Sequence, residues 1–579
     1  MRYPTLPTRP GSRETVEIFR GYNHTLRPGT GEFYHMENLT SDAFPVLSPR
    51  GKRGIYARTA SPQGIIAKEQ VCYVDGGDFV IGTERIAMGL RTAPADCPKK
   101  LVSMGAYVII LPDKMYINTA KPEDFGSIEQ RNTADNPSFT LCDGSGGIYE
   151  QVTVSGSAPE NPENSSCWID TSGETHTLKR YGAGGWTAIP ATYIRIQAPG
   201  IGKGLRRYDG VTLSGITAEG AEQLNGSAVV WDCGEDYILV PGLLEQAGEQ
   251  ETAVTAARVM PELDHIIESE NRLWGCRYGT AADGQQVNEI YACKLGDFRN
   301  WSCFMGLSTD SYAASCGTDG PFTGAVTHLG HPLFFKEHCV HKVYGSSPES
   351  FEIQTTACRG VQKGSHGSLA IVGETLFYKA RSAVCAYDGS LPVEVSQPLG
   401  STAYFDAVGG AHGNKYYISM GDDRGQWHLF VYDTAKNMWH REDSLRAGGF
   451  CSWMGEMYCV DAGSRNILTL LGTGESYEAQ VAWEAETGDL GLNSPDMKYV
   501  SRLLLRLMLE PDAMLDVLIQ YDMDPGWIHL CNIRGTDLRS FTVPVIPRRS
   551  DHMKLKLVGS GGAKLYGITK VIQEGSDRS

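Results

Sequence analysis

The sequence predicts an all-β protein: a β-propeller of six or seven blades, with an inserted small β-domain and a C-terminal β-sandwich. Three observations predict this class. The chain has 67 Gly, and its 27 Tyr outnumber its 17 Phe, a mixture typical of short strands joined by tight turns. Strand, turn and strand follow one another without an intervening helical pattern. These units recur about every 35–50 residues, as propeller blades do.

The first element, residues 1–60, is rich in Pro, Gly, Arg and Thr and has no sustained period of 2 or 3.6 residues. It therefore reads as an extended N-terminal arm. A segment this polar does not bury enough apolar surface to fold alone. We expect packing on its own core or on a neighbouring subunit to order it.

The first blades are predicted at 61–131. Residues 71–74 and 79–81 are apolar and enclose an Asp-Gly-Gly-Asp turn, which is a hairpin signal. A second strand pair surrounds a Pro-Asp turn, with strands at 106–111 and 115–118. At 579 residues the chain is too long for one hydrophobic core, so further domains are expected.

An inserted β-domain is predicted at 132–256. It contains a polar loop, Trp168, Trp186 and short apolar runs at 191–196 and 228–231. An insertion into a propeller is tolerated where the two ends of the inserted segment lie close together.

The remaining blades are predicted at 257–474. The units share a pattern, of which not every unit shows every part: an apolar strand, a second strand that ends in or near an aromatic residue, and then an Asp turn. The turn aspartates are Asp297, Asp388, Asp433 and Asp461. One blade cannot bury both of its faces alone, so blades must stack on one another.

The last element, 475–579, is predicted as the C-terminal sandwich. The run 499–508 resembles a helix in its leucine content, but the alternation at 553–557 and the apolar run 514–519 favour strands.

Charge and cysteine usage indicate the compartment. The net charge is −16, which disfavours a protein that grips nucleic acid but suits a solubilising surface or a duct through which DNA slides. Fifteen cysteines without a CxxC pair indicate reduced thiols, most of them buried. The N-terminus has no apolar signal-peptide core, and no run reaches the roughly 18 apolar residues of a membrane helix. We expect assembly in a cytoplasm.

The sequence offers no catalytic motif. GxSxG, HExxH, Walker and GxGxxG–acid patterns are absent, as are the Asp boxes of sialidase propellers. We therefore predict no enzymatic activity, no cofactor, no metal and no catalytic residue. The sharpest zinc candidate is His338-Cys339-Val340-His341 with Glu337, but alternate residues of a strand point to opposite faces, so we interpret this run as structural.

Three other groups of residues have a composition that could suit a functional site. The turn aspartates Asp297, Asp388, Asp433 and Asp461 are interpreted as caps of backbone N–H groups rather than calcium ligands or catalytic acids. Glu484, Glu486 and Asp489 near Trp483 suggest glycosidase carboxylates, but nothing fixes their separation and we interpret them as a solvated strand edge. The ten tryptophans suggest a sugar platform, but blade packing accounts for most of them; they are Trp168, Trp186, Trp231, Trp274, Trp301, Trp427, Trp439, Trp453, Trp483 and Trp527.

Several short motifs resemble phage tail proteins. Phe19-Arg20-Gly21-Tyr22-Asn23, the run 31–40 and the stretch from Pro49-Arg50 to Arg53-Gly54 resemble the opening of tail proteins from prophages of Gram-positive gut bacteria. Glu270-Asn271-Arg272-Leu273-Trp274 and Leu295-Gly296-Asp297-Phe298-Arg299-Asn300-Trp301 resemble the tail nozzle family, which includes tail tubular protein B and the stabilisation proteins of short-tailed phages. Phe335-Lys336-Glu337, Tyr344-Gly345 and Ala386-Tyr387-Asp388-Gly389-Ser390 fit the following blades.

The resemblance covers about residues 15–470 through individually short motifs. It implies a virion component without enzymatic activity that forms a homo-oligomeric ring around the DNA exit channel and docks tail adaptor and fibre proteins. DNA would pass without specific binding, and no membrane insertion is implied. Two alternatives stay open: a receptor- or glycan-binding protein at the tail tip involved in host attachment, and a propeller glycoside hydrolase.

Overall fold

The computed structural model describes residues 11–91, 98–281, 284–492, 497–522 and 524–574. Within these residues the chain is all-β, and its only helices are three short 3-10 turns, η1 (Glu222–Leu224), η2 (His366–Ser368) and η3 (Gln397–Leu399). The chain divides into two compact units. Unit 1 comprises 1–99, 335–340 and 357–579, and unit 2 comprises 100–334 and 341–356. The predicted all-β class is confirmed.

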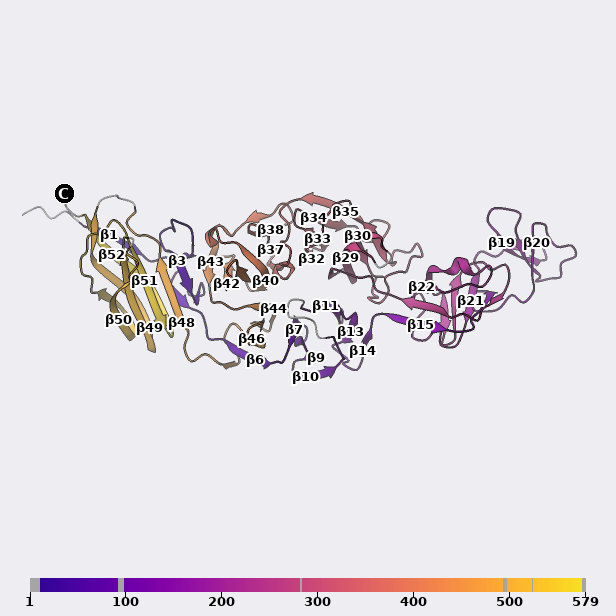
Figure 1. The fold of residues 1–579 in the computed structure, drawn as a ribbon, viewed down its shortest axis with the longest axis horizontal. Coiled ribbons are helices and arrows are strands. Elements are labelled where there is room, and N and C mark those ends of the chain that lie inside the picture. The colour runs from indigo at the N-terminus through magenta and orange to yellow at the C-terminus, as the bar shows by residue number, and fades with distance from the viewer. Residues whose placement is uncertain (1–10, 92–97, 282–283, 493–496, 523, 575–579) are drawn as a thin grey trace, which may run out of the picture. The chain divides into compact units, whose positions relative to one another are not determined.

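Unit 1 contains four sheets that resemble propeller blades, three of them built from four consecutive strands (Figure 1). They are β7 (Pro62–Ala67), β8 (Val71–Asp75), β9 (Asp78–Ile81) and β10 (Glu84–Ala87); β36 (Ala370–Val372), β37 (Thr375–Lys379), β38 (Val384–Tyr387) and β39 (Val393–Glu394); and β40 (Tyr404–His412), β41 (Lys415–Asp422), β42 (Trp427–Asp433) and β43 (Met438–Arg441).

The fourth sheet takes strands from two distant parts of the chain. It comprises β44 (Ala447–Trp453), β45 (Glu456–Asp461), β46 (Asn466–Thr469), β6 (Gly54–Arg58) and β47 (Glu475–Ser476). β6 pairs antiparallel with β46, so a strand from the N-terminal part of the chain completes the last blade-like sheet. The sequence places 54–58 in the arm, because pairing with a partner about 400 residues away leaves no local signal.

Three further sheets are each built from four consecutive strands. Two of them lie wholly in unit 2, and the strands of the third are divided between the two units. They are β11 (Lys100–Met104), β12 (Tyr107–Leu111), β13 (Met115–Asn118) and β14 (Phe125–Ser127); β28 (His265–Ser269), β29 (Arg272–Thr280), β30 (Gln286–Ala292) and β31 (Tyr312–Ser315); and the divided sheet of β32 (Gly324–His328), β33 (His331–Lys336), β34 (Cys339–Tyr344) and β35 (Glu352–Ala357). The predicted hairpin strands 71–74 and 79–81 lie in β8 and β9, and 106–111 and 115–118 match β12 and β13.

Buried clusters join neighbouring blade-like sheets within each unit. In unit 1, Val71 and Val80 of the β7–β10 sheet share a cluster with Val460 and Ile467 of the β44–β47 sheet. The first and last blade-like sheets along the chain are therefore neighbours. The β40–β43 sheet packs against the other side of the last one, and in unit 2 the β28–β31 sheet packs against the β11–β14 sheet. Such face-to-face stacking buries surfaces that one blade alone leaves exposed.

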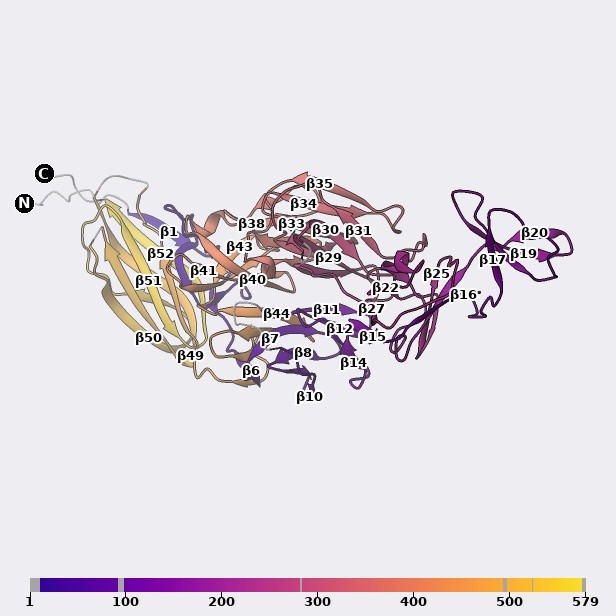
Figure 2. The same cartoon turned by 45° about the vertical axis from the view of Figure 1, so that its right-hand side comes forward.

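The predicted insertion forms three sheets in unit 2 (Figure 2). Its first strand pairs antiparallel with its last, from Gln130↔Arg258 to Ala134↔Val254, so the ends of the insertion lie side by side. The strands are β15 (Gln130–Ala134), β27 (Val254–Arg258), β22 (Gly210–Ser214) and β23 (Gly226–Val229); β24 (Asp232–Gly234), β25 (Tyr237–Pro241), β21 (Tyr193–Gln197), β16 (Ser138–Cys142) and β26 (Gly248–Glu249); and β17 (Val152–Ser155), β18 (Cys167–Asp170), β19 (Thr177–Gly182) and β20 (Gly185–Ala188).

The C-terminal strands form one eight-stranded sheet together with N-terminal strands. Its members are β1 (Ser12–Val16), β2 (Gly21–Tyr22), β3 (Glu32–Glu37), β48 (Ala482–Thr487), β49 (Lys498–Tyr521), β50 (Ile528–Val543), β51 (Met553–Ser560) and β52 (Ala563–Glu574). A separate small sheet pairs β4 (Leu39–Thr40) with β5 (Ser48–Pro49).

Two expectations differ from this arrangement. The segment expected to be an arm contributes three strands to the C-terminal sheet, and Phe19, Phe33 and Met36 are buried in its core. The strands expected to form a sandwich belong to one hydrogen-bonded sheet, because β49 is long enough to change partner. Its first half pairs with β52 and its second half with β51. The strand prediction for 499–508 is confirmed.

Most of the fourteen cysteines that the structure describes are buried, and all fourteen are free thiols. Their burial confirms the expectation that they serve as small apolar residues. Among the described residues, no helix has the length and apolar character needed to cross a membrane.

Candidate functional site

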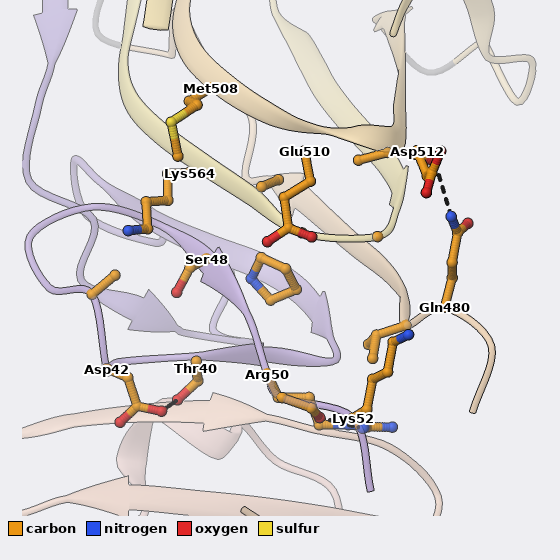
Figure 3. A pocket seen from close by; sticks show the side chains of 18 of the residues that line it. Thr40, Asp42, Ser48, Arg50, Lys52, Gln480, Met508, Glu510, Asp512 and Lys564 are labelled. Carbon is orange, nitrogen blue, oxygen red and sulfur yellow. Dashed lines mark hydrogen bonds between the residues drawn. The ribbon is translucent and has the colours of Figure 1, made fainter. Parts of the chain in front are cut away.

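A charged pocket of about 660 Å³ lies in unit 1, at a corner of the C-terminal sheet. Figure 3 shows side chains from four chain segments around it, which form three walls. One wall comes from Thr40 to Lys52, the second from Ala479 to Val481, and the third from Met508 to Ala513 with the turn at 561–564. Its volume falls within the roughly 300–1,000 Å³ of small-ligand pockets.

The corner forms where β49 changes partner. Pairing with β52 ends at Leu509↔Ala563, and pairing with β51 begins at Met514↔Ser560. The residues between them, 510–513, leave the regular ladder. Gly562 lies beside the Glu510 side chain, since a Cβ at this glycine would lie 2.2 Å from the Glu510 carboxyl carbon and would displace the carboxylate. The Glu510 carboxylate points from the sheet into the pocket (Figure 3).

The opposite wall is held by an ion pair. The Lys415 ammonium donates to Asp42 at 2.6 Å and to the Thr40 hydroxyl at 3.1 Å. Burial works to raise the pKa of the Asp42 carboxyl, but the hydrogen bond and charge of Lys415 outweigh it and the pKa falls below its usual value. The Asp42 carboxylate is therefore ionised, and the ammonium of Lys415 balances its charge.

The basic residues of the pocket differ in whether they form an ion pair within the protein. Arg50 is committed to a bidentate pair with Glu478, with both N–O distances at 2.8 Å. By contrast, no ion pair is found within the described residues for Lys52, Lys564 and Glu510, which are all exposed. Unpaired charges of both signs around one hollow suit a ligand that also carries both signs, such as a polypeptide segment.

A smaller cavity of about 240 Å³ lies in unit 2 and is lined by Glu270, Arg272, Trp274, Leu295 and Gly345, among others. These residues belong to the motifs on which the expected resemblance to the nozzle family rests. The Arg272 guanidinium donates to the carbonyl oxygens of Cys293 at 2.9 Å, Asp310 at 2.6 Å and Ser308 at 2.9 Å. Arg272 thus links three backbone segments by hydrogen bonds, so its role is structural.

The zinc candidate does not assemble as a metal site within the described residues. Both ring nitrogens of His341 lie 2.8 Å from hydroxyls, those of Thr318 and Thr355. Cys339 is buried in β34, whereas His338 is exposed in the preceding turn. His338 therefore lies outside the strand that carries Cys339 and His341.

The interpretation of the turn aspartates as caps is confirmed. One carboxylate oxygen of each accepts a backbone N–H two or three residues later. The distances are 3.2 Å from Arg299 to Asp297, 3.0 Å from Ser390 to Asp388, 3.1 Å from Lys436 to Asp433 and 2.9 Å from Gly463 to Asp461. A carboxylate used in this way organises its own turn.

The interpretation of Glu484 and Glu486 as a strand edge is wrong. Both lie on β48, which is an interior strand between β3 and β51. Lysines of β51 neutralise them: Lys556 lies 2.5 Å from Glu484, and Lys554 lies 3.7 Å from Glu486. Lys554 also reaches Asp489 at 4.0 Å. Burial raises the pKa of Glu486, partly offset by these lysines.

The tryptophans divide evenly between buried and half-buried positions. Trp168, Trp274, Trp301, Trp439 and Trp483 are buried, and Trp186, Trp231, Trp427, Trp453 and Trp527 are half-buried. Blade packing is therefore confirmed for Trp274, Trp301 and Trp439. Trp168 is buried in the insertion and Trp483 in the C-terminal sheet, so these two pack outside the blade-like sheets.

Sequence reasoning missed the charged pocket because its walls come from segments more than 400 residues apart. One signal was available in the sequence. Glu510-Pro511-Asp512 interrupts an otherwise alternating apolar strand, and Gly561-Gly562 follows the strand that pairs with it. Such interruptions mark a bulge or a bend at which side chains are re-aimed.

No protein-family model matches the chain, and no curated protein matches it. Solved structures that share some likeness include AztD from Citrobacter koseri, at 9% identity and a TM-score of 0.26 over 73% of this chain and 96% of that chain. Another is an exo-beta-1,3-galactanase from Phanerochaete chrysosporium, at 9% identity and a TM-score of 0.21 over 53% of this chain and 95% of that chain. These scores are too low to bear on function.

Proposed function

We propose that this chain is a structural component of a bacteriophage tail, of the nozzle-like type, without enzymatic activity. Its blade-like sheets would form a β-propeller of six or seven blades that carries the inserted β-domain and the C-terminal sheet. Copies would form a ring around the DNA exit channel, with DNA passing through unbound. Such a protein would be assembled in the bacterial cytoplasm and carried in the virion tail.

The observation that carries the proposal is the role of the residues that resemble the nozzle family. Asn300 is 1% exposed, donates to the Tyr208 carbonyl at 2.7 Å and accepts the Gly210 N–H at 2.9 Å. Trp301, also buried, donates to the Phe298 carbonyl at 2.9 Å. Together with Arg272, these residues connect a blade-like sheet to its loops and to the insertion. The motif residues thus hold the fold together and line no reaction site, which is what we expect of a structural protein.

The packing of the sheets supports the propeller. The first and last blade-like sheets along the chain share a buried cluster, and strand β6 from the N-terminal side completes the last one. Closure of a ring requires both features, because neighbouring blades cover one another's faces and the chain ends must meet.

The charged pocket supports docking of a protein partner. Lys52, Lys564 and Glu510 offer charges of both signs at a fixed corner, and complementary charges on a partner would set its register. We propose that a segment of a tail adaptor or fibre protein binds here.

The test is quantitative mass spectrometry of purified phage particles induced from the source lysogen, scaled to the major capsid protein. Roughly six or twelve copies per particle would match a symmetric ring. Roughly three copies would instead match a fibre or tip protein. Absence of the chain from intact particles would rule the proposal out.

A second candidate is a glycan-binding protein at the tail tip. Trp168, Trp186 and Tyr181 cluster in the small β17–β20 sheet, with Trp186 lying 5.3 Å from each of the other two rings. Trp168 is buried with the Lys179 ammonium 5.0 Å from its ring, so the half-buried Trp186 and Tyr181 are the rings that a ligand could reach. Aromatic faces beside a cation can stack on sugar rings. Binding of host cell-wall glycans that is lost in Trp186→Ala would favour this candidate. The propeller glycoside hydrolase stays a hypothesis.

A further inference from the structure

The smaller cavity, of about 240 Å³, is lined by residues of two neighbouring blade-like sheets in unit 2. Ser269, Arg272 and Trp274 come from the β28–β29 hairpin, and Pro332 and Val343 come from β33 and β34. The cavity is smaller than the roughly 300–1,000 Å³ pockets that hold drug-sized ligands. Its size therefore suits a small molecule.

Ser269 and Arg272 project from the same face of their hairpin. They are directly opposed in the antiparallel pair of β28 and β29, whose register is unbroken from His265↔Cys276 to Ser269↔Arg272. Opposed residues have neighbouring side chains on one face, and Trp274, two residues beyond Arg272, shares that face. A hydroxyl, a guanidinium and an indole thus belong to one wall of the cavity.

The Arg272 guanidinium is buried without a carboxylate partner. The residue is 2% exposed, and within the described residues it forms no ion pair. Three of its five N–H groups donate to backbone carbonyls, which leaves one on Nε and one on Nη2 without an acceptor in the described structure. Burial lowers its pKa despite the nearby carboxylate of Asp310, which itself accepts the backbone N–H groups of Met305 and Leu307. A buried cation is costly unless an anion pairs with it.

The Ser269 hydroxyl is also buried and without a partner. The residue is 2% exposed, and its Oγ forms no hydrogen bond in the described structure. Leaving a buried hydroxyl unsatisfied costs free energy. Together with the two remaining N–H groups of Arg272, it makes three donors on one wall. A carboxylate can accept all three, because its two oxygens offer about four acceptor sites.

The remaining walls of the cavity are mostly apolar. Trp274 and Val343 are buried, and the half-buried Phe351 ring lies 4.9 Å from Trp274 and 5.7 Å from the Arg272 guanidinium. At the rim, Leu295 is 41% exposed. A group bound beside the guanidinium would therefore carry an apolar body that these side chains remove from water.

The donors favour a carboxylate over a phosphate. The planar guanidinium presents N–H groups that match the two oxygens of one carboxylate. A phosphate carries more oxygens and more charge than two N–H groups and one hydroxyl can satisfy, and its remaining oxygens would be buried against apolar walls at a high cost. A cationic ligand would be repelled by the buried guanidinium.

We propose that this cavity binds a small carboxylic acid with an apolar body. The carboxylate accepts hydrogen bonds from Arg272 and Ser269, and the apolar body lies against Trp274 and Phe351. Arg272 then has two roles, because three of its N–H groups hold backbone segments and the other two bind the ligand. The site belongs to the folded chain by itself and does not rest on the phage assignment.

The test is isothermal titration calorimetry of the full chain at neutral pH with acetate, isovalerate and hydrocinnamate. We expect saturable binding of isovalerate and hydrocinnamate, with acetate weaker because it buries less apolar surface. Hydrocinnamyl alcohol has the same body as hydrocinnamate without the carboxylate, and it should not bind measurably. The proposal is overturned if none of the three acids binds at millimolar concentration, or if the alcohol binds as well as the acid.

Ser269→Ala separates binding from folding. It removes a hydroxyl that has no partner in the free protein, so urea unfolding should show no loss of stability. Hydrocinnamate should nevertheless bind at least about tenfold more weakly, because its carboxylate loses a hydrogen bond. Ser227→Ala, an exposed change on β23 of the same unit, is the matched control and should alter neither measurement.

Glu270→Gln removes an exposed carboxylate from the lining of the cavity. Because like charges repel, this change should not weaken the binding of hydrocinnamate. Loss of binding in Glu270→Gln would overturn the proposal, and so would an unchanged affinity in Ser269→Ala.

Discussion

At the scale of single residues, sequence reasoning succeeds where the chemistry is local. Asp388 and Asp461 cap backbone groups two residues away, so the turn alone determines their role. It fails where the partner is distant. Glu484 meets Lys556, which lies 72 residues later, and the pairing places it inside a sheet rather than at an edge.

His440 shows the same dependence on distant partners, and it yields a pH prediction. The residue is 0% exposed, and neither ring nitrogen has a hydrogen-bond partner in the described structure. Burial, reinforced by the charge of Lys415 and partly offset by Asp42 and Asp433, lowers its pKa from 6.5 to about 3. The folded state therefore keeps this imidazole neutral at pH values where the unfolded chain protonates it.

The lowered pKa determines how stability changes with pH. Between about pH 6.5 and 3 the unfolded state binds one more proton at this site, so the stability that His440 contributes is complete above pH 6.5 and declines as the pH falls. The decline amounts to roughly 1.4 kcal/mol per pH unit. Urea unfolding at pH 5 and pH 7 should show a smaller loss of stability for His440→Leu than for the unchanged chain.

The matched control is His338→Leu, because His338 is exposed in the turn between β33 and β34. That variant should keep the full pH dependence of the unchanged chain. An equal loss of stability at pH 5 in the His440 variant and the unchanged chain would show that His440 does not titrate in this way.

At the scale of elements, the sequence predicts strands better than it predicts their partners. The alternation at 553–557 places β51 correctly, because one face of that strand is buried. The partners of β3 and β6 lie more than 400 residues away, in β48 and β46. Nothing local specifies those pairings, so 1–60 reads as an arm although much of it is sheet.

The connection between the insertion and a blade-like sheet gives a prediction at this scale. Asn300 is the side chain that fixes Tyr208 and Gly210 of the insertion. Asn300→Ala would leave the buried Gly210 N–H without its partner, at a cost of about 1–3 kcal/mol. The loop that carries the exposed Arg206 and Arg207 should then open more often.

Limited trypsin digestion measures this opening, because trypsin cleaves after arginine. Cleavage at Arg206 or Arg207 should be several-fold faster in Asn300→Ala than in the unchanged chain. Asn164→Ala, an exposed change elsewhere in the insertion, should leave the rate unaltered. Equal cleavage of all three proteins would mean that Asn300 does not hold this loop.

At the scale of the whole molecule, the charge balance bears on how the chain meets DNA. The net charge is −16, and a protein that binds the phosphate backbone needs basic residues free to displace counterions. The sequence has three adjacent pairs of basic residues, at 99–100, 206–207 and 548–549. At least one residue of each pair is buried or already contacts another side chain. Arg207 lies 5.0 Å from the Trp231 ring, Arg548 lies 3.4 Å from Asp524, and Lys99 is 4% exposed.

We therefore predict that duplex DNA does not bind the purified protein. Fluorescence anisotropy of a labelled duplex should stay unchanged on titration at about 50 mM salt, where non-specific binding is strongest, and again at about 200 mM. A fragment of the same length bound to a basic control protein would show the expected loss of affinity between the two conditions. Saturable binding that weakens steeply with salt would mean that this chain holds DNA by its phosphates, and the idea of a duct with a non-adhesive wall would then be abandoned.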